Sequence, residues 1–171
     1  RIPGIDIKLQ HNDIFKFGII DFRIILVPGH TIGHICFFSN KEKIIFTGDT
    51  LFSLGCGRVF EGTYSQMLKS INEIKNLPED TNIYCGHEYT KKNLDFCSEI
   101  EFDNHLLKEK KRWVDLRISK KEPTVPISIK EELSTNIFLR CNTRSLKKIL
   151  GMEKSTEVEI FKKLRDLKDS F

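Results

Sequence analysis

The sequence predicts an α+β fold in which a layered sheet-and-helix part is followed by an all-helical part. Short apolar runs punctuated by glycine and asparagine fill the first half of the 171 residues, which is typical of strands. After residue 87 the apolar residues recur at intervals of three and four, which is the period of amphipathic helices. We therefore expect a boundary near residue 88, with one domain over 1–88 and a second over 89–171.

Four strands are expected in the first part, and they cover residues 22–27, 34–38, 43–46 and 82–85. The polar stretch 39–42 between the second and third strands has the length of a hairpin connection, which favours their antiparallel pairing. A helix is expected before the fourth strand, because Met67, Ile71 and Ile74 recur with helical spacing and Pro78 ends the pattern. A helix between strands indicates a layered α/β arrangement.

The second part predicts helices over residues 94–100, 104–118, 129–133, 145–150 and 156–168. Two prolines make residues 123–126 a rigid extended connector between them. The net charge of +4 comes entirely from residues 88–171. Because these positive residues alternate with acidic ones and lack interleaved aromatics, a solvated helical surface is favoured over a nucleic-acid site.

Composition limits the class of protein further. Hydrophobic residues make up 39% of the chain, and no apolar run reaches the ~20 residues that span a bilayer, so we expect no membrane partner. Five cysteines without CxxC pairing indicate reduced thiols and a reducing compartment. We expect the cytoplasm, and an organellar form stays open because the sequence begins like a fragment, without an initiator methionine.

Three segments each place a metal-binding side chain at the end of an apolar run. His30 follows the strand expected at 22–27, Asp49 follows 43–46, and His87 follows 82–85. Only a folded sheet brings side chains so distant in sequence within the ~2 Å reach of one ion. Imidazole and carboxylate ligands suit zinc, iron or manganese without choosing among them. Asp49 offers two oxygens for bridging two cations, although alone it would be interpreted as an Asx-turn or a helix cap.

The other histidines are interpreted as structural or exposed. His34 would chelate an ion together with His30 only on a helix, and Gly33 within a glycine-containing turn argues against a helix there. His11 lies in a polar loop, and His105 lies in an amphipathic helix.

Six motifs together resemble one family. They are His-Thr-x-Gly-His (30–34), Phe-Thr-Gly-Asp-Thr-Leu-Phe (46–52), Gly-Cys-Gly-Arg (55–58), Phe-Glu-Gly-Thr (60–63), Tyr-Cys-Gly-His-Glu-Tyr-Thr (84–90) and Glu-Pro-Thr-Val-Pro (122–126). From about residue 22 to the C-terminus, the chain resembles glyoxalase II, the hydroxyacylglutathione hydrolase branch of the metallo-β-lactamase superfamily. The resemblance implies the second part of a metallo-β-lactamase-like αβ/βα sandwich, followed by a helical substrate-binding domain.

The resemblance also implies roles for the three ligands. His30 would bind the first metal, His87 the second, and Asp49 would bridge both and take part in catalysis. The family uses two divalent ions, with zinc favoured over iron or manganese. A hydroxide held between them attacks the thioester of S-D-lactoylglutathione, which gives D-lactate and glutathione.

Four further residues match substrate-binding positions of the family: Arg58, Tyr89, Arg165 and Lys168. Basic residues suit the two carboxylates of a small-molecule glutathione thioester. Arg165 and Lys168 are three residues apart and share one helical face, yet ordinary surface charge is an equally weighted interpretation. The chain departs from the family at Phe60, where many relatives have tyrosine, so a hydroxyl contact is expected to be absent. The oligomeric state is left open.

A larger departure concerns the upstream motif of the family, His-x-His-x-Asp-His, which does not occur in these 171 residues. We therefore expect this chain to supply only part of the site. Two alternatives stay open: a related metallo-β-lactamase-fold hydrolase or a persulfide dioxygenase with a single iron, and a catalytically inactive fragment.

Overall fold

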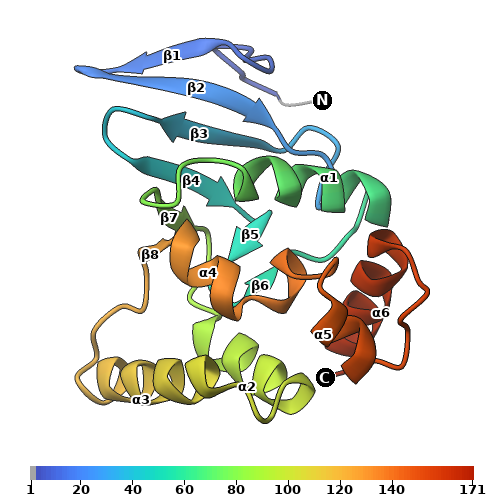
Figure 1. Cartoon of the computed structure of the whole chain (residues 1–171). Coiled ribbons are helices and arrows are strands. Elements are labelled where there is room, and N and C mark those ends of the chain that lie inside the picture. The colour runs from blue at the N-terminus through green and yellow to red at the C-terminus, as the bar shows by residue number, and fades with distance from the viewer. Residues whose placement is uncertain (1–2) are drawn as a thin grey trace.

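The structure, a computed structural model, describes residues 3–171 and is built on a six-stranded sheet (Figure 1). The strand order is β1-β2-β3-β4-β7-β8, and every neighbouring pair is antiparallel except β4 and β7, which are parallel. A separate hairpin lies between this sheet and the C-terminal helices. The strands are β1 (Ile14–Phe17), β2 (Ile20–Leu26), β3 (Ile35–Ser39), β4 (Ile44–Gly48), β7 (Asn82–Cys85) and β8 (Ile127–Ser128), with β5 (Leu51–Phe52) and β6 (Gly55–Cys56) in the hairpin.

Helix α1 (Tyr64–Lys75) connects the hairpin to β7 and begins with a capping box between Thr63 and Gln66. Its apolar stripe, including Met67 and Ile71, is fully buried. The helical spacing of these residues predicted this element, and the helix ends three residues before Pro78.

The remaining helices are α2 (Thr90–Ile100), α3 (His105–Ser119), α4 (Ile129–Thr135), the short 3-10 turn η1 (Ile137–Leu139), α5 (Arg144–Ile149) and α6 (Glu157–Ser170). Of these, α2 and α3 lie at the opposite end of the molecule from β1, whereas α4, α5 and α6 lie nearer the hairpin and α1 (Figure 1). One continuous buried cluster runs from Ile25 in β2 to Leu164 in α6, so the sheet and the C-terminal helices share a core. Among the helices of residues 3–171, none is both long and apolar enough to cross a membrane.

The predicted α+β class is confirmed, and so is the antiparallel pairing of β3 with β4. Strands β1, β5, β6 and β8 were not predicted from the sequence. The last three are two residues long, so pairing partners rather than periodicity define them. Helix α2 begins at Thr90, four residues earlier than predicted, because the polar residues Lys91 and Lys92 conceal its first turn.

Candidate active site

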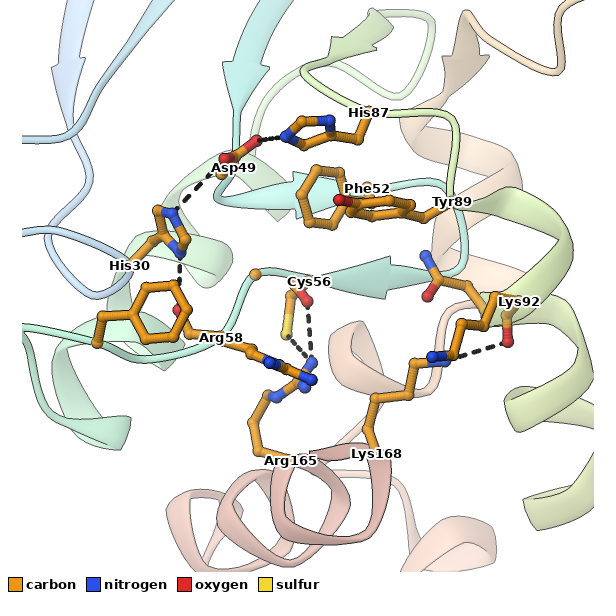
Figure 2. Close-up of a pocket in the computed structure, with 13 residues that line it drawn as sticks. His30, Asp49, Phe52, Cys56, Arg58, His87, Tyr89, Lys92, Arg165 and Lys168 are labelled. Atoms are coloured by element: carbon orange, nitrogen blue, oxygen red, sulfur yellow. Dashed lines mark hydrogen bonds and ion pairs between the residues drawn. The ribbon is translucent and has the colours of Figure 1, made fainter. Parts of the chain in front are cut away.

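Asp49 lies between two histidines at the edge of the sheet (Figure 2). Strands β4 and β7 are parallel neighbours, so the residues that follow them emerge at the same edge. Asp49 directly follows β4, and His87 comes two residues after β7. Asp49 Oδ1 is 3.5 Å from His87 Nε2, and Asp49 Oδ2 is 3.5 Å from His30 Nε2. The structure thus brings together the three ligands expected from strand ends.

The ring of His30 is oriented by a backbone carbonyl. Its Nδ1 lies 2.9 Å from the carbonyl oxygen of Arg58. A carbonyl can only accept, so Nδ1 donates the hydrogen bond and Nε2 keeps its lone pair in the neutral ring. An imidazole lone pair that faces a carboxylate oxygen is the arrangement of two ligands of one cation, and a hydrogen bond from the other ring nitrogen is the usual support of such a ligand.

Hydrogen bonds also hold the backbone of Asp49 and the residue that follows His87. The backbone N–H of Asp49 donates to His34 Nε2 at 3.0 Å, which agrees with the structural role expected for His34. Burial, together with the neighbouring His30, lowers the pKa of His34, so the neutral accepting form is favoured. After His87, the carboxylate of Glu88 accepts hydrogen bonds from the N–H and the hydroxyl of Thr124, at 2.9 and 2.7 Å.

Two glycines allow the backbone to approach Asp49 closely. A Cβ at Gly86 would lie 2.6 Å from Asp49 Oδ1, and a Cβ at Gly57 would lie 1.9 Å from the Asp49 carbonyl oxygen. Any side chain at either position would therefore displace the central carboxylate or its backbone.

The donor types fit divalent cations, but the number of donors per cation is small. His30 with Asp49 forms one pair, and His87 with Asp49 forms the other. Over residues 3–171 no group of three or more His, Cys, Asp and Glu side chains is arranged to hold an ion. Protein zinc sites use at least three protein ligands. Each pair is consequently part of a site rather than a full one, in keeping with the lack of a His-x-His-x-Asp-His string in the chain.

A cavity of about 490 Å³ opens beside these ligands (Figure 2). All seven residues expected at the site line it, although they come from both halves of the chain. Sequence reasoning missed Lys92 and Asn93, which lie in the first turn of α2. They follow Tyr89 by three and four residues, so helical spacing counted from Tyr89 would have indicated them. The cavity is lined by His30, Asp49, Phe52, Cys56, Gly57, Arg58, Phe60, His87, Tyr89, Lys92, Asn93, Arg165 and Lys168.

The far side of the cavity from His30, Asp49 and His87 is basic (Figure 2). Four cationic side chains line it, two of them from α6. Arg165 is only 3% exposed, so its interpretation as ordinary surface charge is wrong. Its Nη1 donates to the carbonyl of Cys56 at 2.9 Å, and its Nη2 donates to Asp169. Burial lowers the pKa of Lys168 to about 8, and its Nζ donates to the carbonyl of Lys92 at 3.1 Å.

Aromatic rings form the wall beside His87. The ring of Tyr89 stacks on His87 with centroids 4.9 Å apart, and Phe52 contacts Tyr89 edge-on at 5.2 Å. Phe60 lies against His30, at 5.0 Å between centroids. The phenyl ring of Phe60 carries no hydroxyl, so it presents an apolar surface to the cavity.

The fold and the ligand set define the class of protein. Residues 1–87 match the family description "Metallo-beta-lactamase superfamily". Among solved structures, the chain is similar to ETHE1 from Myxococcus xanthus, with a TM-score of 0.58, 21% identity, and coverage of 96% of this chain and 60% of that one. A metallo-β-lactamase from Staphylococcus aureus gives a TM-score of 0.55 and 22% identity, with 94% of this chain and 42% of that one covered. These likenesses show a metallo-β-lactamase fold.

The match of the second half of the chain and the relatives with higher sequence identity indicate a family within this superfamily. Residues 88–171 match the description "Hydroxyacylglutathione hydrolase C-terminus". Over all 171 residues the chain is 52% identical to a hydroxyacylglutathione hydrolase of Pelagibacter ubique and 43% identical to one of Chelativorans sp., covering 66% and 67% of their lengths. The chain belongs to the hydroxyacylglutathione hydrolase family, which confirms the resemblance to glyoxalase II. It spans about two thirds of the length of these relatives.

Proposed function

We propose that the whole protein hydrolyses S-D-lactoylglutathione to D-lactate and glutathione. One observation carries the proposal: a carboxylate held between two imidazoles borders a cavity whose other side presents four cationic side chains. Such a cavity suits a substrate with a reactive carbonyl at one end and carboxylates at the other. The glutathione thioester has both features.

His30, Asp49 and His87 are the residues that we propose to hold two divalent ions, with Asp49 shared between them. When bound, such ions supply a water of lowered pKa and polarise the thioester carbonyl. The choice of zinc over iron or manganese is also a proposal, since imidazole and carboxylate suit all three. The thiolate leaving group needs little acid assistance, because a thiol pKa of about 8.5 makes it a fair leaving group near neutral pH.

We propose that Arg58, Lys168 and the buried Arg165 provide the positive field that attracts the carboxylates of glutathione. Fixed cations in a partly enclosed cavity attract an anionic ligand more strongly than exposed ones do. Tyr89 forms the aromatic wall next to His87, where the acyl part of the substrate would lie.

We further propose that the chain comprises two domains that meet near residue 88, with the substrate cavity between them. The two family matches, which meet between residues 87 and 88, support this division. Five free cysteines support the cytoplasm as the compartment.

Assay of the natural protein with S-D-lactoylglutathione tests the function. We expect hydrolysis that is lost on chelation and restored by a divalent metal, and we expect Asp49→Asn to remove it. Asp49→Asn keeps the size of the side chain while losing the charge that two cations require. A metal-loaded protein that leaves this thioester intact would refute the proposal. The isolated residues 1–171, with two donors per ion, are expected to bind metal weakly and to be inactive.

A further inference from the structure

Asp169, in the last turn of α6, contacts two arginines that line the cavity from different elements. Its Oδ1 accepts a hydrogen bond from Arg165 Nη2 and lies 3.4 Å from Arg58 Nε. Arg165 stands on the same helix, whereas Arg58 belongs to the segment after β6. One carboxylate oxygen thus connects the C-terminal helix to the loop beside the metal ligands.

Asp169 is held firmly at the Arg165 end. The guanidinium of Arg165 is buried and is also bonded through Nη1 to the Cys56 carbonyl. A buried guanidinium without a counter-ion is costly, and Asp169 supplies this counter-ion one helical turn away. The position of the Asp169 carboxylate is therefore set by Arg165 and by the helix, and not by Arg58.

The side chain of Arg58, unlike that of Arg165, is exposed. Its side chain is 58% exposed, and within residues 3–171 its guanidinium makes no hydrogen bond and pairs with Asp169, which lies 3.4 Å from Nε. A mobile arginine side chain loses rotamer entropy when it binds a ligand, so a partner that already restricts it lowers this cost. Contact through Nε restricts the guanidinium plane and leaves the edge with the two terminal nitrogens available. That edge can bind a carboxylate through two parallel hydrogen bonds.

The backbone of Arg58 ties the same residue to the metal ligands, because its carbonyl accepts the hydrogen bond from His30 Nδ1. The His30 ring and the guanidinium are thus connected through one residue, and only the torsions of the Arg58 side chain vary the distance between them. Restricting the side chain fixes where a carboxylate would bind relative to the ligand set.

We propose that Asp169 is a positioning residue that orients the Arg58 guanidinium to bind a carboxylate of the glutathione thioester. The proposal rests on the proposed function for the identity of the ligand. A purely electrostatic role predicts the opposite result, because removal of a negative charge from a basic cavity strengthens the binding of an anion.

The test compares Asp169→Asn with the wild type in the natural, metal-loaded protein. We expect KM for S-D-lactoylglutathione to rise about threefold to tenfold with kcat within about twofold, as for loss of uniform binding. Arg58→Ala should give a similar increase, and the double variant should be no worse than Arg58→Ala alone. Asp166→Asn is the matched control, since Asp166 lies on the same helix but contacts Tyr64 and Lys162.

An unchanged or lower KM in Asp169→Asn, or strict additivity with Arg58→Ala, would overturn the positioning role. Titration calorimetry of glutathione itself provides the same comparison without turnover. The affinity of Asp169→Asn for glutathione should fall by the same factor, whereas that of Asp166→Asn should not change. If the wild type fails to hydrolyse the thioester, the proposed function fails, and the calorimetric comparison still decides the role of Asp169.

Discussion

At the scale of single residues, the position of the Asp49 carboxylate depends on neighbours that are not expected to bind metal or substrate. Gly86 leaves room for Asp49 Oδ1, and His34 fixes the Asp49 backbone. Gly86 does not adopt a positive φ, so it is required for space and not for conformational freedom.

Gly86→Ala should therefore impair metal binding without preventing folding. The added methyl group would lie 2.6 Å from Asp49 Oδ1, so the carboxylate must turn away from His87. Displacement of this kind is expected to weaken metal affinity about 10-fold to 100-fold, as disturbed supports of metal ligands do. The metal content of the natural protein after dialysis against increasing concentrations of a chelator measures the effect.

Gly33→Ala is the control for this experiment. A Cβ at Gly33 meets nothing within 4 Å, and Gly33 also lacks a positive φ. We expect this variant to retain wild-type metal content. Equal losses in the two variants would show that close packing against Asp49 is not the reason for glycine at position 86.

At the scale of elements, the β5–β6 hairpin is held by side chains of the C-terminal helices. Glu132 Oε2 accepts from the N–H of Leu54 at 2.8 Å, and Asn136 Nδ2 donates to the carbonyl of Gly55 at 3.2 Å. From α2, Asn93 Nδ2 donates to the carbonyl of Ser53 at 2.9 Å. These bonds satisfy backbone groups of the hairpin turn and of β6.

This arrangement predicts a pH dependence of stability. Burial raises the pKa of Glu132 from 4.5 to about 7, although the bonds from Leu54 and Asn136 oppose the rise. Between these values the folded state binds more protons than the unfolded state, so stability falls as pH rises through this window. The melting temperature should decline from about pH 5 to about pH 8, and Glu132→Gln should flatten that decline. An identical slope in the variant would exclude Glu132 as the cause.

The sequence predicted those elements whose signals are local. Strand ends followed by glycine located Asp49 and His87, and helical spacing located α1 and α6. The hairpin was missed because its strands are two residues long and its partners, Glu132 and Asn136, lie about 80 residues away. The ion pair between Arg58 and Asp169 was missed for the same reason, because no periodic pattern in either segment indicates a contact between residues so far apart in the sequence.

At the scale of the whole molecule, the two proposed domains share one buried cluster and the cavity between them. We therefore expect one cooperative unfolding transition. The single tryptophan, Trp113 in α3, reports on the helical part, whereas circular dichroism reports on both parts. Thermal melts followed by the two probes should coincide. Two separate midpoints would show that the parts unfold independently.

The ring of His30 is held by a main-chain group of residue 58, which leaves the side chain at that position free to vary. The group that orients the His30 ring is the main-chain carbonyl of residue 58, whereas the side chain of that residue lines the cavity. Every amino acid carries the carbonyl, so replacement of the side chain preserves the hydrogen bond to the imidazole. Position 58 can thus accept different side chains while the hydrogen bond that orients His30 is kept.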